Sequence, residues 1–156
     1  MGFLAVVPVG VTTDDPRHLG WLAGQLVLHS AATNRLAIRA ARAAGRPLPR
    51  AYESGVVWFD SAPLPFQDFA DCLTVLRRGV GDCKQLVAWR IAELYEDGHA
   101  AMPRVFCRDR SSPHEGWRMH ALLRHAPQCA CQLCHAQPDE VRRVGYIEDP
   151  SRLLGM

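Results

Sequence analysis

Residues 79–90, GVGDCKQLVAWR, decide the fold that this sequence predicts. Two glycines interrupt the chain, and an aspartate and a cysteine then begin a run with the apolar spacing of a buried helix face: Leu86, Val87, Ile91 and Leu94. Asp82 is a favourable N-cap, which places Cys83 in the first helical turn, among unpaired backbone N–H groups. The sequence therefore predicts a helix with a cysteine at its N-terminus.

The position of Cys83 favours ionisation of its thiol, but not strongly enough to make it a nucleophile unaided. The partial positive charge of a helix N-terminus is worth at most about 2 kcal/mol, and one pKa unit corresponds to about 1.36 kcal/mol. A thiol with a pKa near ~8.5 must shift by about two units to be mostly thiolate at neutral pH. Cys83 therefore needs a cationic partner, for which histidine is the best candidate, and an active Cys83 should be alkylated before the other cysteines.

Two downstream segments supply a histidine and an acid. Residues 116–123 alternate like a strand and carry His120, and residues 144–151 form a second expected strand that carries Asp149 at its end. If the strands pair antiparallel with His120 opposite Asp149, both side chains lie on one face of the sheet. The acid would then orient the imidazole, and the imidazole would activate the Cys83 thiol.

These motifs resemble the transglutaminase-like family of papain-like cysteine enzymes. The resemblance rests on Gly81-Asp82-Cys83 at a helix start, His120-Ala121 on a strand, and Asp149-Pro150-Ser151 at the end of the next strand. Residues 52–56 and 148–156 are also similar to compact transglutaminase-like proteins of tailed bacteriophages. The resemblance implies an α+β fold of the papain-like, transglutaminase-like kind, with the Cys-bearing helix packed on an antiparallel β-sheet.

The length of 156 residues suits a single domain, able to bury about two-thirds of its unfolded surface. Its N-terminal region, residues 1–50, is expected to hold a strand over residues 1–11 and an added helix over residues 16–44, begun by an acidic cap and a proline. The expected buried stripe of this helix is Leu19, Leu22, Leu26, Ala37, Ala40 and Ala44. Residues 51–156 form the expected catalytic core, with a Cys-rich hairpin insert at 127–140.

Composition and charge indicate an ordinary globule and name no partner. The net charge is +2, and 48% of the residues are hydrophobic. A second stripe of the N-terminal helix is basic, and we expect it to be a solvated face rather than a site for nucleic acid or an acidic partner: Arg35, Arg39, Arg42 and Arg46. No apolar run reaches the ~18 residues of a membrane span, and the N-terminus lacks the basic region of a signal peptide.

These features predict a cytoplasmic protein with reduced cysteines, without membrane or nucleic-acid partners. If a phage encodes it, the expected location is the host cytoplasm or the virion.

Three cysteines and a histidine gather between the two expected strands: Cys129, Cys131, Cys134 and His135. Thiolate and imidazole ligands at short spacing suit zinc, so we expect one structural zinc ion at the hairpin tip, away from the chemistry. Free thiols or a disulfide are the alternatives, and His125 or water could supply the fourth ligand in place of His135. Otherwise His125, opposite in parity to His120, should face away from Cys83 as an ordinary polar residue.

The expected function is a thiol-dependent enzyme, a cysteine peptidase-type hydrolase or acyl transferase, acting on a protein or peptide without a catalytic cofactor. Cys83 would form a thioester, His120 would move the proton, Asp149 would hold the imidazole, and water or an amine would resolve the intermediate. Tyr52 or Gln67 could bind the oxyanion beside the Cys83 N–H, although packing alone would also explain them. The alternative function is a non-catalytic phage assembly or virion protein that binds a phage structural protein through the same fold.

Overall fold

The longest element of the computed structural model is helix α1 (Pro16–Ala43). The structure describes residues 15–60, 68–108 and 118–156. Asp15 caps α1, because its side chain accepts a hydrogen bond of 2.8 Å from the main-chain N–H of Arg17, and Pro16 occupies the first turn. The helix predicted over residues 16–44 is confirmed, whereas the strand predicted over residues 1–11 lies outside the described residues.

Short elements follow α1 and lead to the cysteine-bearing helix: η1 (Ala51–Glu53), β1 (Val57–Trp58), α2 (Cys72–Arg78) and β2 (Val80–Gly81). β1 and β2 form a parallel pair. Helix α3 comes next, followed by three strands. Two small helices lie between the second and third of these strands, and a short helix comes last: α3 (Cys83–Glu96), β3 (Ala101–Arg108), β4 (Arg118–His125), α4 (Gln132–His135), α5 (Asp139–Val144), β5 (Ile147–Glu148) and α6 (Pro150–Leu153).

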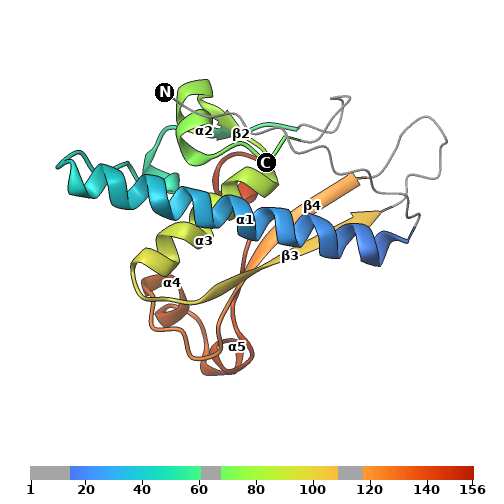
Figure 1. Ribbon diagram of the computed structural model, residues 1–156. Helices are drawn as coiled ribbons and strands as arrows, with labels where there is room; N and C mark the ends of the chain where they lie inside the picture. Colours follow the sequence, from blue (N-terminus) through green and yellow to red (C-terminus); the bar gives the residue numbers. More distant parts are fainter. Residues whose placement is uncertain (1–14, 61–67, 109–117) are drawn as a thin grey trace.

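The main sheet of the described residues is antiparallel in the order β3-β4-β5, and helices cover one of its faces. Helix α1 packs on β3 and on α3, and α3 packs on β4, whereas α4 and α5 lie at the lower end of the sheet (Figure 1). The architecture is therefore mixed α+β, with a small antiparallel sheet. Among the described residues, no helix combines the length and apolar character needed to cross a bilayer.

The register of β5 differs from the predicted one by two residues. Leu123 of β4 lies opposite Glu148, whereas the predicted register would place it opposite residue 146. Because a shift of two preserves the alternation of side chains, His120 and Asp149 still belong to the same face. The shift arises because the connection between β4 and β5 is not a simple hairpin but contains α4 and α5.

Alternation along the strands decides which residues reach the core. Ala121 and Leu123 of β4 are fully buried in one cluster with Cys83 of α3, and His125 shares their parity and is also buried. Met102 and Phe106 of β3 belong to the opposite face, and about half of each side chain is exposed. The expectation that His125 faces away from Cys83 is therefore wrong, because the helix-facing parity of β4 is the odd one.

The buried stripe of α1 also differs from the prediction. It consists of small and polar residues together with two larger apolar ones: Gly20, Ala23, Val27, Ser30, Ala31, Asn34 and Ile38. None of the predicted stripe residues is fully buried, and Ala40 and Ala44 are exposed. The reason is a close approach to β3, since a Cβ on Gly20 would lie 2.9 Å from the Val105 carbonyl oxygen.

The basic stripe of α1 is neither simply solvated nor open to a partner over its length. Arg35 and Arg39 both bind Glu96 at the end of α3, with nitrogen–oxygen distances of 2.8 and 2.9 Å. Arg42 lies 3.5 Å from Asp97, the next acid along the chain. These ion pairs fasten α1 to the C-terminal end of α3, so much of the positive charge is already compensated within the chain.

Candidate functional site

Cys83 occupies the first turn of α3, where the sequence places it. Asp82 is the N-cap and accepts hydrogen bonds from the main-chain N–H groups of Lys84 and Gln85, at 3.0 and 3.1 Å. The Gln85 side chain returns a bond by accepting from the N–H of Asp82, which completes a capping box. Both Asp82 and Lys84 are buried, and the Lys84 ammonium lies 2.6 Å from the Asp82 carboxylate.

The surroundings of the thiol favour its protonated form. The Cys83 sulfur donates to the main-chain carbonyl of Met119 at 3.8 Å, and the residue is only 7% exposed. Burial raises the pKa of the Cys83 thiol; the positive charge of Lys84 opposes this shift and the negative charge of Asp82 adds to it. The helix N-terminus therefore does not overcome desolvation here, and the arrangement does not favour alkylation of Cys83 before the other thiols.

The fold brings His120 of β4 and Asp149, which follows β5, into contact. His120 Nε2 lies 3.1 Å from Asp149 Oδ2, and both side chains are partly exposed. Asp149 is also the N-cap of α6, where its other carboxylate oxygen accepts from the N–H of Ser151 at 3.1 Å. Since the carboxylate holds Nε2, the second nitrogen, Nδ1, is the one that could exchange a proton with a thiol.

Cys83 approaches this pair without joining it. Among the described residues, no hydrogen bond connects Cys83 to His120, because His120 belongs to the face opposite Ala121, which packs in the core beside Cys83. The contact to the Met119 carbonyl nevertheless places the sulfur against the residue that precedes His120. The arrangement is a His–Asp pair and a neighbouring buried thiol.

Of the two oxyanion candidates, the structure describes Tyr52. The hydroxyl of Tyr52 donates to Glu148, and burial is the largest of the causes that raise its pKa. This donor is thus committed to a buried carboxylate and not directed at the chemistry of Cys83. Gln67 lies outside the described residues.

A second site lies at the far end of β4, where a histidine and three cysteines could hold a metal ion: His125, Cys129, Cys131 and Cys134. One donor atom from each lies within 4.8 Å of the others, and all four residues are buried. The prediction that His135 is the fourth ligand is wrong. His135 follows Cys134 on α4, and its side chain is exposed. The sequence pointed to His125 as a ligand by its position only four residues before Cys129. Its burial could not be read from the sequence, because burial depends on which face of β4 packs on the helices.

A buried carboxylate supports His125 from behind. Glu148 Oε2 lies 2.6 Å from His125 Nε2, and Oε1 accepts from Arg90 at 2.9 Å and from the Tyr52 hydroxyl. Burial alone would raise the pKa of Glu148, but the His125 hydrogen bond, the Arg90 charge and the Tyr52 hydrogen bond together hold it below its usual range. Glu148 is therefore a carboxylate despite being 0% exposed.

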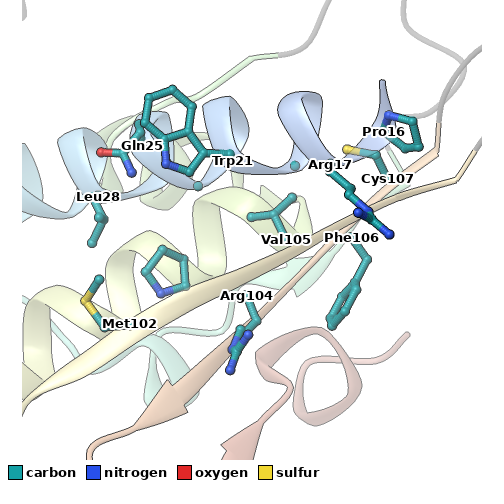
Figure 2. A pocket seen from close by; sticks show the side chains of 13 residues that line it. Pro16, Arg17, Trp21, Gln25, Leu28, Met102, Arg104, Val105, Phe106 and Cys107 are labelled. Carbon is teal, nitrogen blue, oxygen red and sulfur yellow. The ribbon is translucent and has the colours of Figure 1, made fainter. Parts of the chain in front are cut away.

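A surface groove of about 440 Å³ lies elsewhere, between α1 and β3. Figure 2 shows Trp21 on α1 and Val105 directed from β3 toward the helix, whereas Arg104 and Phe106 extend to the other side of the strand. Neither Cys83 nor the His120–Asp149 pair lines it. The groove is therefore separate from both sites.

Comparison of the chain with protein-family models, curated proteins and solved structures finds no significant match. The resemblance to transglutaminase-like enzymes thus rests on the sequence motifs around Cys83, His120 and Asp149.

Proposed function

We propose that the protein is a thiol-dependent acyl enzyme of the transglutaminase-like kind, acting on amide or acyl bonds of proteins or peptides. The observation that carries the proposal is the 3.1 Å contact between His120 Nε2 and Asp149 Oδ2, beside a helix that begins at Cys83. A carboxylate that fixes one imidazole nitrogen prepares the other nitrogen to accept a proton from a nucleophile.

In the proposed reaction, the Cys83 thiol leaves the Met119 carbonyl, and a shift of α3 against β4 brings its sulfur to Nδ1 of His120. The thiol then gives its proton to that nitrogen. The sulfur attacks the substrate carbonyl carbon, and the carbonyl electron pair moves to oxygen. Collapse of this oxyanion forms the thioester, while the leaving amine takes the proton from the imidazolium. Water then hydrolyses the thioester, or a second amine accepts the acyl group.

A second candidate, a non-catalytic scaffold that binds a phage structural protein, is favoured by one observation. Cys83 is nearly buried, its thiol is bound to a main-chain carbonyl, and burial raises its pKa. A core thiol of this kind packs as a small apolar side chain. On this alternative, replacing Cys83 by alanine would leave the protein's role intact.

An activated ester separates the two candidates without knowledge of the substrate. The protein is incubated with p-nitrophenyl acetate at neutral pH, and the acetylated residue is located by peptide mass spectrometry. The enzyme proposal predicts a thioester on Cys83 that a Cys83→Ala variant cannot form, whereas a Cys107→Ala variant forms it normally. Acetylation confined to surface amines and Cys107 would support the scaffold.

We also infer that the cluster of His125, Cys129, Cys131 and Cys134 holds a structural zinc ion. Zn–S bonds of about 2.3 Å and Zn–N bonds of about 2.0–2.1 Å at a tetrahedral angle separate sulfur from nitrogen by about 3.6 Å. The sulfurs of Cys129 and Cys131 lie 3.7 and 3.6 Å from His125 Nδ1. With Cys134 as the fourth ligand, no coordination position is left for a substrate, which is typical of structural zinc. Elemental analysis showing about one zinc per chain would test this inference.

A further inference from the structure

We propose that the metal site orders the strand that delivers Asp149, acting through Glu148. The inference rests on the zinc site proposed above, and it does not require that Cys83 be catalytic. Its starting point is the position of Glu148, which touches the ligand His125 with its side chain and immediately precedes Asp149 in the chain. Glu148 is thus a positioning residue shared by the two sites.

The ring of His125 is oriented by its contact with Glu148. Its Nε2 lies 2.6 Å from Oε2 of Glu148, whose other oxygen already accepts from Arg90 and Tyr52, so Nε2 is the nitrogen that donates to this carboxyl group. Nδ1 is then the unprotonated nitrogen, and it is the atom that faces the sulfurs of Cys129 and Cys131. A carboxylate behind a histidine ligand fixes the tautomer in this way and makes the ligand more basic.

Glu148 is bound by protein groups and has no access to water. The carboxylate is completely buried between Arg90 of α3, Tyr52 of η1 and His125 of β4. Arg90 also binds Glu93 at 3.1 Å, and Glu93 in turn accepts from the main chain of Ala51 at 2.6 Å. The network therefore ties the metal ligand to the core helix and to η1 at the same point.

Strand β5 is short, and so is its main-chain pairing with β4. Ile147 and Glu148 pair with β4, one further main-chain bond of 2.9 Å runs from the His125 N–H to the Tyr146 carbonyl, and the chain turns into α6 directly after Asp149. A two-residue strand has few ladder hydrogen bonds of its own, so the side-chain anchor at Glu148 carries a large part of its attachment. A metal ion that fixes His125 also fixes this anchor, and with it the Asp149 carboxylate against His120.

The network explains the chemistry of the residues that surround the ion. The three cysteine sulfurs and His125 Nδ1 lie together as four donor atoms, and Glu148 lies among buried donors on the other side of the imidazole. One tetrahedral zinc ion satisfies the thiolates and the bare nitrogen together. When the ion is lost, no metal bond holds His125 Nδ1, and the imidazole ring is free to turn away from Glu148.

The coupling is tested by comparing the zinc-loaded protein with protein from which a chelator has removed the metal. Two NMR readouts are used: amide exchange of Glu148, and the tautomer of the His120 ring from its nitrogen chemical shifts. Metal removal should speed exchange at β5 and change the His120 ring from one tautomer to a mixture, with the α1 amides unchanged. Identical β5 exchange and an identical His120 tautomer in both forms would overturn the proposal.

Substitutions keep the test decisive if chelation unfolds the chain. Glu148→Gln should weaken zinc binding by about 10- to 100-fold, the usual effect of losing a partner behind a metal ligand. Glu140→Gln is the matched control, because Glu140 is an exposed acid of α5 in the same connection, and its zinc affinity should equal that of the parent. Equal affinity in the two variants would contradict the role of Glu148.

Two further variants identify the ligands. Cys131→Ser should lose the zinc, whereas His135→Ala should keep it, because His135 is exposed. These outcomes are independent of the acetylation experiment, so a metal site that orders β5 and an inactive Cys83 can be recognised separately. A chain purified without chelator that contains no zinc, and does not bind it when it is added, would end the inference.

Discussion

Replacing Gly20 by alanine should separate α1 from β3, and Gly24→Ala provides the control on the same helix. A Cβ on Gly20 would lie 2.9 Å from the carbonyl oxygen of Val105, a main-chain atom that cannot move alone. A Cβ on Gly24 would meet no atom within 4 Å. The two substitutions are chemically identical and differ in whether the added methyl group has space.

The magnitudes follow from two opposing effects. Glycine to alanine in a helix interior stabilises by about 0.8–1.0 kcal/mol, which applies to both variants. Overpacking in a tight contact costs about 1–3 kcal/mol, and only Gly20→Ala incurs it. The free energies of unfolding of the two variants should therefore differ by about 2 kcal/mol, and at about 2–4 °C per kcal/mol their melting temperatures by about 4–8 °C.

Thermal and urea unfolding followed by far-ultraviolet circular dichroism measures both variants beside the parent. Gly24→Ala should unfold at a higher temperature than the parent and Gly20→Ala at a lower or equal one. If both variants were stabilised equally, α1 would not approach β3 as closely as the structure places it, and the reason given for its small-residue stripe would fail.

Three other predictions concern charge. Burial raises the pKa of Cys72 to about 12 and also raises that of Cys83. The folded chain therefore keeps protons that the unfolded chain loses, so the free energy of unfolding measured with urea should fall as the pH rises above about 8.5. Hydrogen bonds from Arg39 and Arg35 lower the pKa of Glu96. The stability that these ion pairs contribute is therefore present above a pH of about 4.5 and is lost on acidification. Glu96→Gln should lower the free energy of unfolding by about 1 kcal/mol at neutral pH and reduce its dependence on pH in the acid range. Asp149→Asn should change stability by less than about 1 kcal/mol, since asparagine also caps helices, yet slow Cys83 acetylation; an unchanged rate would remove Asp149 from the site.

Sequence reasoning succeeds where local patterns decide the outcome. The capping box at Asp82 and the apolar spacing after Cys83 define α3, and the strand predicted around His120 coincides with β4. The acid and proline before α1 likewise fix where that helix begins. These elements are specified by residues within one or two turns of each boundary, so a single sequence contains the information.

The remaining features depend on how the elements meet. The buried side of α1 is set by the backbone of β3 at Gly20, and the arginines of α1 are paired by acids that lie at the end of α3. The helix-facing parity of β4 and the register of β5 come from packing, and they decide that His125 belongs to the metal site. They also decide that Cys83 bonds the main-chain carbonyl of Met119, while His120 bonds Asp149.

The most direct test of the proposed enzyme is the rate at which p-nitrophenyl acetate acetylates Cys83 in the parent and in His120→Ala. Cys107 in the same sample serves as the internal standard, because it is a partly exposed thiol of β3. General base catalysis by a positioned side chain contributes about 10²–10⁴-fold, so the variant should acetylate Cys83 at least about tenfold more slowly while Cys107 reacts at its former rate. Equal rates at Cys83 in the two proteins would show that His120 does not act on the thiol and would contradict the proposed enzyme.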